Sequence, residues 1–197
     1  MSKKRIALII NIAIVILEVI VFGSNIINDH GIAIQYYTND SNILALISSL
    51  LFIVLYRKNW KYLKDFRFAT TCCLIVTFLT VLFILGPMDH FNYKLYMFTD
   101  NFLILHTIVP ILSAISYIFF EEKSGKAYLC LLLTIIYSIV LVILNILNIV
   151  QGPYPFLMVT KQSVLETIIW AVIILGGSYI IGLILNLISR KKGANDV

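Results

Sequence analysis

Long apolar stretches alternate with short polar connections along the whole chain. The six stretches cover residues 6–27, 41–56, 68–85, 101–120, 127–150 and 163–189. Each is about long enough to cross the ~30 Å hydrocarbon core of a bilayer as an α-helix. With 60% apolar residues and a mean hydropathy of +0.97, the chain is too apolar for a soluble globular protein. We therefore predict an all-α polytopic membrane protein, with six transmembrane helices in a single domain over residues 1–197.

Basic residues gather on one side of this predicted bundle. Thirteen of the fifteen Lys and Arg lie in residues 3–5, 57–67, 123–126 and 190–192, and the other connections contain only Lys94 and Lys161. Because positively charged flanks stay in the cytoplasm, we expect the N- and C-termini to be cytoplasmic. The three histidines, His30, His90 and His106, then lie in or near the outer half of the membrane.

The charge pattern also limits the partners of the chain. The net charge of +5 comes from short juxtamembrane segments, which argues against nucleic acid as a partner and favours contact with membrane lipids that carry anionic headgroups. The first apolar stretch is too long for a signal peptide and lacks a small-residue cleavage site, so we interpret it as the first spanning helix. The Ile-, Lys- and Asn-rich composition favours a multipass protein of a bacterial plasma membrane.

Polar residues inside the apolar stretches are informative, because each is costly in lipid unless it faces the bundle interior. Glu18 lies near the middle of the first stretch, and Glu166 lies near the outer start of the sixth. Asn145 and Asn148 are three residues apart near the outer end of the fifth stretch, so we expect them to share a helix face. His106 lies about one and a half turns into the fourth. Most of these residues belong to the outer half.

Pro110 follows His106 by four residues. Because proline has no N–H, the carbonyl of His106 would lose its helical partner, and we expect the helix to kink there. The freed carbonyl needs another donor, either a side chain or a water. A histidine beside a helix break either hydrogen-bonds between helices for packing or faces a polar cavity, and its position leaves both interpretations open.

Thr38 precedes a polar run, Asn39-Asp40-Ser41-Asn42, at the predicted start of the second helix. Any of these side chains could cap the helix by accepting from its unpaired N–H groups. The same N–H groups, with the partial positive charge of a helix N-terminus, would also stabilise an oxyanion. A threonine hydroxyl at such a place, with an imidazole to take its proton, could be an acyl-transfer nucleophile.

Three short segments of the chain carry a family resemblance. They are Tyr36-Tyr37-Thr38, then Leu105-His106-Thr107 with Pro110 following, and Gly152-Pro153-Tyr154-Pro155-Phe156-Leu157. In order and spacing they resemble the androgen-induced and androgen-dependent TFPI-regulating membrane protein family, most closely its bacterial relatives. The resemblance covers nearly the whole chain, and the Tyr-Pro-Phe turn before the last helix is its most specific part. The proline after the histidine lies one residue closer than in the animal members, and the residues after the threonine are more polar.

This resemblance implies an activity. The animal members are six-helix intramembrane hydrolases of fatty acid esters of hydroxy fatty acids (FAHFA), and they use a threonine nucleophile and a histidine. Carried over by motif, Thr38 would attack the ester carbonyl and His106 would act as general base. The implied enzyme is a carboxylic ester hydrolase that takes a long-chain lipid ester sideways from the outer leaflet. The resemblance implies no cofactor, and no ligand spacing among the histidines supports a metal site.

Other residues are candidates for supporting roles. Oxyanion donors could be N–H groups at the start of the second helix, or the amides of Asn42 or Asn101. A carboxylate of Asp40, Asp100 or Glu166 could orient the imidazole, although Asp100 lies six residues before the histidine, about 120° away around a helix, so a direct contact is not expected. The substrate pocket is expected to include Tyr37, Asn145, Asn148, Tyr154 and Phe156.

Two other functions fit the same pattern. Two three-helix halves of opposite orientation suit an inverted repeat, so the chain could be a small transporter or a proton-coupled carrier with Glu18 as its proton site. Against this, the polar residues gather in the outer half and trace no path across the membrane. The remaining hypothesis is a structural membrane protein that catalyses nothing.

Overall fold

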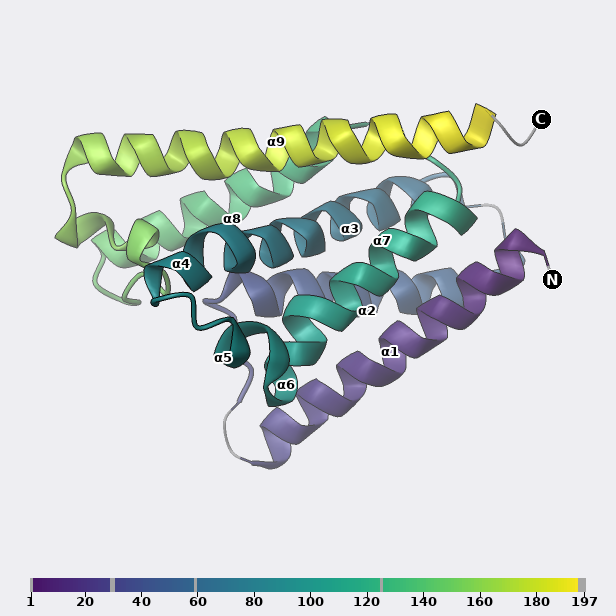
Figure 1. The fold of residues 1–197 in the computed structure, drawn as a ribbon, viewed down its shortest axis with the longest axis horizontal. Helices are drawn as coiled ribbons and strands as arrows, with labels where there is room; N and C mark the ends of the chain where they lie inside the picture. The colour runs from purple at the N-terminus through teal and green to yellow at the C-terminus, as the bar shows by residue number, and fades with distance from the viewer. Residues whose placement is uncertain (1, 29–30, 59, 125, 195–197) are drawn as a thin grey trace.

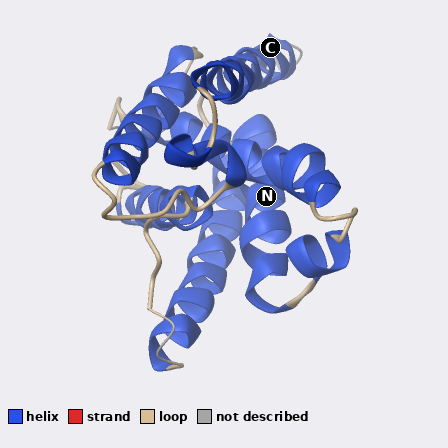
Figure 2. Ribbon diagram, turned by 90° about the vertical axis from the view of Figure 1, so that its left-hand side faces the viewer, coloured by secondary structure: helices blue, strands red, loops and turns tan. Residues whose placement is uncertain are grey.

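A computed structural model of the protein describes residues 2–28, 31–58, 60–124 and 126–194, the last five of these by their backbone alone. Throughout the described residues the regular structure is helical and no strand occurs (Figure 2), which confirms the predicted all-α class. Six helices in this part of the chain are long and apolar enough to cross a membrane. The protein is therefore a multipass helical membrane protein.

Four of the spans are single helices and two are compound. The single helices are α1 (Lys3–Ile27), α2 (Tyr37–Val54), α8 (Tyr128–Ile146) and α9 (Val164–Ala194). In the third span, α3 (Leu63–Thr80) continues through a π-helical turn, η1 (Val81–Leu85), into α4 (Gly86–Met88). In the fourth, α6 (Asp100–Leu103) continues through the π-helical turn η2 (Ile104–Ile108) into α7 (Val109–Phe120). The connections contain α5 (Tyr93–Phe98), η3 (Pro155–Leu157) and η4 (Val159–Lys161).

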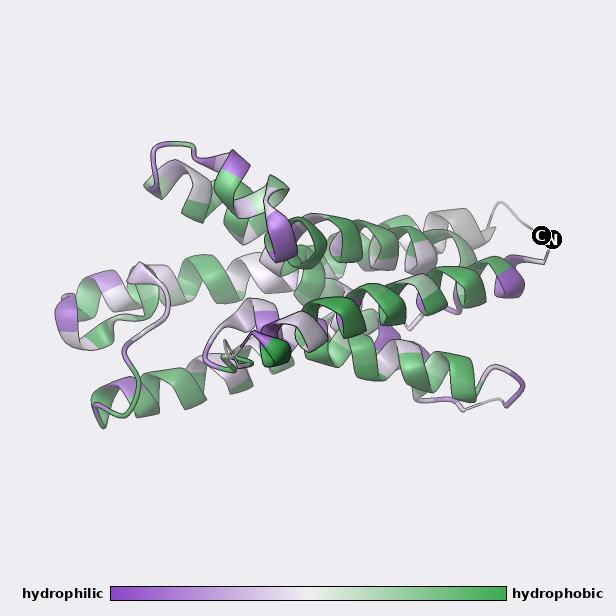
Figure 3. Ribbon diagram, turned by 90° about the horizontal axis from the view of Figure 1, so that it is seen from below, coloured by the Kyte–Doolittle hydropathy of each residue, from purple (hydrophilic) through white to green (hydrophobic). Residues whose placement is uncertain are grey.

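Helix α3 lies at the centre of the bundle and packs against α2, α7, α8 and α9 (Figure 1). Helix α1 packs against α2 and α7, and α9 runs along α8. The start of α1 and the end of α9 lie at the same end of the bundle, and hydrophobic residues dominate the helices between the two ends (Figure 3). The termini thus share one side, as predicted, while the cytoplasmic location of that side stays a prediction.

Two of the predicted helix ends that are wrong concern residues assigned to the site. Helix α2 begins at Tyr37, four residues before the predicted start, so Thr38 lies in its first turn and no side chain caps it. The polar run continues the helix, since the Asp40 N–H donates to the Tyr36 carbonyl. Ser41 Oγ and Asn42 Nδ2 both donate to the carbonyl of Thr38. Helix α8 ends at Ile146, and Asn148 lies beyond it with φ +55°, so Asn145 and Asn148 do not share a helix face.

Arg67, assigned from the sequence to a charged connection, is fully buried in α3. Its Nε and Nη2 donate to the two carboxylate oxygens of Glu121 at 3.0 and 2.9 Å, and its Nη1 donates to the hydroxyls of Ser48 and Ser49. A buried ion pair is tolerated when further hydrogen bonds satisfy both groups, and Asn11 and Ser116 complete the shell of Glu121. This network joins α1, α2, α3 and α7 at the end of the bundle that carries the termini.

Pro87 shows how the π-helical turns are stabilised. In such a turn the N–H of one residue bonds to the carbonyl five residues earlier, so Pro87, which has no N–H, leaves the carbonyl of Leu82 unpaired. The hydroxyl of Tyr93 donates to that carbonyl at 2.9 Å. Gly86 makes room for it, because a Cβ there would lie 2.3 Å from the Tyr93 ring.

Candidate active site

The structure brings Thr38 and His106 together from two different spans. The Oγ1 atom of Thr38, in the first turn of α2, lies 3.1 Å from Nε2 of His106, in the π-helical turn η2. The two residues are only 8% and 5% exposed. In a water-poor environment such a hydrogen bond is stronger than at a surface. The pair implied by the family resemblance is therefore a buried contact.

The second ring nitrogen of His106 decides what the pair can do. Nδ1 lies 2.6 Å from the backbone carbonyl oxygen of Tyr96. A carbonyl can only accept, so Nδ1 carries the proton, and Nε2 of the neutral imidazole presents its lone pair to the Thr38 hydroxyl. The ring of Phe102 stacks on the imidazole, with centroids 5.2 Å apart and planes 3° from parallel. His106 is thus held in the tautomer that a general base for Thr38 requires.

The short helix α5 supplies the carbonyl that orients the imidazole. The last carbonyls of a helix have no intrahelical donor. Here Thr99 Oγ1 donates to the carbonyls of Lys94 and Leu95. His106 Nδ1 donates to the carbonyl of Tyr96, and Thr107 Oγ1 donates to the carbonyl of Met97. This role of α5 was not predicted from the sequence. The polar pair His106-Thr107, facing two adjacent carbonyls, was the available signal.

Pro110 leaves a backbone carbonyl without its helical donor, as predicted, but this carbonyl belongs to the residue before the predicted one. The π-helical turn shifts the hydrogen-bond register, so the carbonyl that Pro110 leaves unpaired belongs to Leu105 and not to His106. Of the two predicted kinds of donor, a side chain or a water, a side chain is present: Asn42 Nδ2 lies 3.3 Å from the Leu105 oxygen. Asn42 also donates to the Thr38 carbonyl at 2.7 Å. This amide therefore joins the backbone that carries Thr38 to the backbone that carries His106.

The two side-chain amides predicted as oxyanion donors are engaged elsewhere. Both N–H groups of Asn42 go to the two carbonyls just described. The amide of Asn101 donates to Ser24 Oγ at 3.1 Å and to Asn25 Oδ1 at 2.8 Å, and so ties α6 to α1. Of the predicted donors, the backbone N–H groups at the start of α2 are the ones that these bonds do not engage.

The three carboxylates predicted to orient the imidazole do not do so, because both ring nitrogens of His106 are occupied by Thr38 and Tyr96. Asp40 lines a groove between α2 and α8. Asp100 is exposed at the start of α6, with φ +43°. Glu166 is exposed and accepts from the N–H and hydroxyl of Ser163 at the start of α9.

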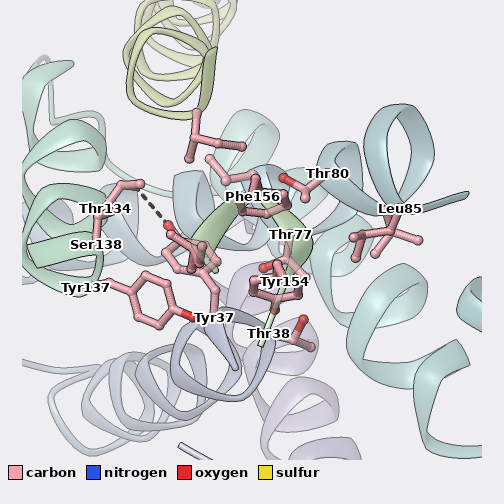
Figure 4. A pocket seen from close by; sticks show the side chains of 14 residues that line it. Tyr37, Thr38, Thr77, Thr80, Leu85, Thr134, Tyr137, Ser138, Tyr154 and Phe156 are labelled. Carbon is pink, nitrogen blue, oxygen red and sulfur yellow. Dashed lines mark hydrogen bonds between the residues drawn. The ribbon is translucent and has the colours of Figure 1, made fainter. Parts of the chain in front are cut away.

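Beside Thr38 lies a small chamber of about 30 Å³. Three of the predicted pocket residues, Tyr37, Tyr154 and Phe156, line it together with Thr38 (Figure 4). The polar part of the lining comes from hydroxyl side chains of α3 and α8, namely Thr77, Thr80, Thr134 and Ser138. A chamber of this size has room for one or two waters, and an acyl chain would need its walls to move.

Tyr154 places a phenol at the N-terminus of α2. Burial raises the pKa of Tyr154 above the ordinary tyrosine value. Its ring meets that of Tyr36 edge to face, with centroids 6.0 Å apart. Tyr154 therefore lines the chamber at the start of α2, together with Thr38.

The other predicted site residues lie away from this chamber. Asn145 donates to the carbonyl of Val150 and accepts from the N–H of Thr160, and with Asn148 it lines a separate cavity of about 190 Å³. His90 is exposed, with φ +51°, and His30 lies outside the described residues. Both asparagines thus shape the connection after α8.

Glu18, the proton site of the carrier hypothesis, is fully buried in α1. Neither of its carboxyl oxygens has a hydrogen-bond partner among the described residues, and it does not line the chamber beside Thr38. Proton transfer needs a chain of polar groups or water.

Comparison with known proteins adds no assignment. No protein-family model matches the chain, and neither the curated proteins nor the solved structures give a match. The family resemblance drawn from the three segments therefore stays a prediction.

Proposed function

We propose that this protein is an intramembrane hydrolase of long-chain lipid esters, with Thr38 as nucleophile and His106 as general base. One observation carries the proposal: Thr38 Oγ1 lies 3.1 Å from His106 Nε2, while Tyr96 holds Nδ1 at 2.6 Å. An activated hydroxyl nucleophile needs a base within hydrogen-bond reach, and the base needs a third group that orients it. A backbone carbonyl fills that third position here.

In the acylation half of the reaction, Nε2 of His106 takes the Thr38 proton as Oγ1 bonds to the ester carbonyl carbon. The carbonyl π electrons move to oxygen and form a tetrahedral oxyanion. When this intermediate collapses, the bond to the alkoxy group breaks, and the imidazolium returns its proton to the leaving alcohol. An acyl-threonine remains. The stacked ring of Phe102 and the Tyr96 carbonyl keep the imidazole in place throughout.

The oxyanion is stabilised by the hydroxyl of Tyr154. Tyr154 lines the chamber together with Thr38, so its O–H can donate to an ester carbonyl held there. With substrate, it turns to the carbonyl oxygen that gains charge.

In the deacylation half, a water in the 30 Å³ chamber attacks the acyl-threonine. Nε2 of His106 takes the proton of this water and then gives it to Oγ1 of Thr38, which releases the fatty acid. The chamber holds little more than that water, so the ester carbonyl must enter through a moving wall. We place the site in the outer half of a bacterial plasma membrane, with both termini cytoplasmic.

The test uses purified protein in detergent, an active-site-directed hydroxyl probe of the fluorophosphonate type, and mass spectrometry to locate the adduct. We expect an adduct on Thr38 that is lost in His106→Ala, and hydrolysis of a long-chain ester that is lost in Thr38→Ala and His106→Ala. Thr107→Ala is the matched control, because it removes only the neighbouring bond to α5. No adduct and no hydrolysis from well-folded wild-type protein would overturn the proposal.

A further inference from the structure

A groove between α2 and α8 leads from the lipid-exposed surface to the Thr38 chamber. The two helices pack against α3 rather than along each other, which leaves a space of about 550 Å³ between them. Cys73 of α3 lies at its floor, and the walls are mainly apolar, with Leu44 on α2 and Val140 on α8. This volume lies in the ~300–1,000 Å³ range of small-molecule sites.

The groove has the length expected for one acyl chain. Along α8 it extends from Leu133 to Leu144, which is about 16 Å at 1.5 Å per residue. That is about half of the ~30 Å hydrocarbon core, or one leaflet. Val150 and Ile34 lie at the end near the connections, and Leu44 and Leu133 lie deeper in the bundle. A chain in the groove would run parallel to the chains of the surrounding lipid.

Two tyrosines separate the groove from the chamber. Tyr37 and Tyr137 line both spaces, and their rings meet edge to face with centroids 4.9 Å apart. The Tyr37 hydroxyl bonds to Thr134 Oγ1 at 3.0 Å, and the Tyr137 hydroxyl donates to the carbonyl of Gln35 at 2.7 Å. Each tyrosine is thus hydrogen-bonded across the groove, to α8 or to the segment before α2.

We propose that this groove binds the acyl chain of the ester substrate, and that the Tyr37–Tyr137 pair is the passage through which the ester carbonyl reaches Thr38. The inference rests on the proposed hydrolase function. The occupant is a hydrocarbon chain because the walls are apolar, the open side faces lipid, and the inner end adjoins the nucleophile. Rotation of the two rings, with loss of two hydrogen bonds, joins the groove to the chamber.

The experiment compares two tryptophan variants of α8. Val140 lines the groove, whereas its neighbour Ile139 does not. The two side chains are similarly exposed, at 47% for Val140 and 55% for Ile139. We expect Val140→Trp to fill the groove and lower kcat/KM for a palmitoyl ester by about tenfold or more, with little change for a butyryl ester. Ile139→Trp should leave both unchanged. A Val140→Trp variant that hydrolyses both esters like wild type would overturn the groove assignment.

A second measurement tests, independently of catalysis, whether the acyl chain binds in the groove. Thr38→Ala protein in nanodiscs is photolysed with a diazirine-bearing palmitoyl ester, and the adducts are mapped by mass spectrometry. We expect adducts on groove residues such as Leu44 and Leu144, which Val140→Trp removes and Ile139→Trp retains. Adducts spread evenly over Ile139, Ile143 and the groove would show bulk lipid only and overturn the inference. Groove adducts without any hydrolysis by wild type would refute the hydrolase function while the groove remains.

Discussion

Asn42 donates a hydrogen bond to the backbone carbonyl of Leu105, the residue before the proposed base. The same amide bonds to the carbonyl of Thr38, so one side chain fixes the nucleophile and the base relative to each other. Truncating it would leave the Leu105 carbonyl buried and unpaired, at a cost of about 1–3 kcal/mol. It would also let η2 shift away from α2.

We therefore expect Asn42→Ala to lower hydrolysis and probe labelling of Thr38 by about 10²-fold, as for other small misplacements of catalytic groups. The matched control is Tyr93→Phe, which unpairs the corresponding carbonyl of Leu82 outside the site. Both variants should lower the thermal unfolding midpoint, measured by scanning fluorimetry in detergent. Equal activity losses in the two variants would show that Asn42 acts through stability alone.

Tyr154→Phe tests the proposed oxyanion donor. Loss of one such donor costs about 10²–10³ in kcat, and we expect a loss of that order in ester hydrolysis. Because the contact of Thr38 with His106 does not involve Tyr154, KM should change little. Tyr36→Phe is the control, since Tyr36 meets the Tyr154 ring edge to face from outside the chamber. A Tyr154→Phe variant with full kcat would leave the α2 N–H groups as the donors.

We expect the Arg67–Glu121 ion pair to contribute to the stability of the folded protein and to have little effect on catalysis. Arg67→Met leaves a buried carboxylate unpaired, which costs about 3–5 kcal/mol. The double variant Arg67→Met/Glu121→Met removes both charges, and we expect it to be more stable than Arg67→Met alone. Unfolding midpoints of wild type, the two single variants and the double variant form the cycle that measures this. A double variant less stable than both singles would contradict it.

The same pair predicts how stability depends on pH. Burial tends to raise the pKa of Glu121, but Arg67 and the hydrogen bonds of Ser116 and Asn11 outweigh it and hold the pKa below the ordinary value of 4.5. A lowered carboxyl pKa in the folded state stabilises the protein above the unfolded pKa, and this contribution disappears as pH falls through the folded value. The unfolding midpoint should therefore fall below about pH 4.5 in wild type, and fall less in Glu121→Gln.

The apolar stretches, the shared side of the termini and the segments around Thr38 and His106 could be found from the sequence. A chain in lipid can adopt fewer kinds of structure than a soluble chain, because a backbone in hydrocarbon must satisfy its hydrogen bonds internally. Hydrophobic patterning does not determine where a helix begins when its first turn is polar. Residues 37–40 look like a loop, yet they form the first turn of α2, in which the Asp40 N–H donates to the Tyr36 carbonyl.

The sequence alone determined that six helices cross a membrane, since hydrophobic length and the cost of unpaired backbone groups in lipid leave no other fold class. The tertiary structure decided which polar groups meet. Arg67 became a buried partner of Glu121, and the imidazole of His106 found its orienting group in the Tyr96 carbonyl of a short helix. These contacts join segments far apart in the chain, and helix periodicity carries no information on how separate helices are rotated and shifted against one another.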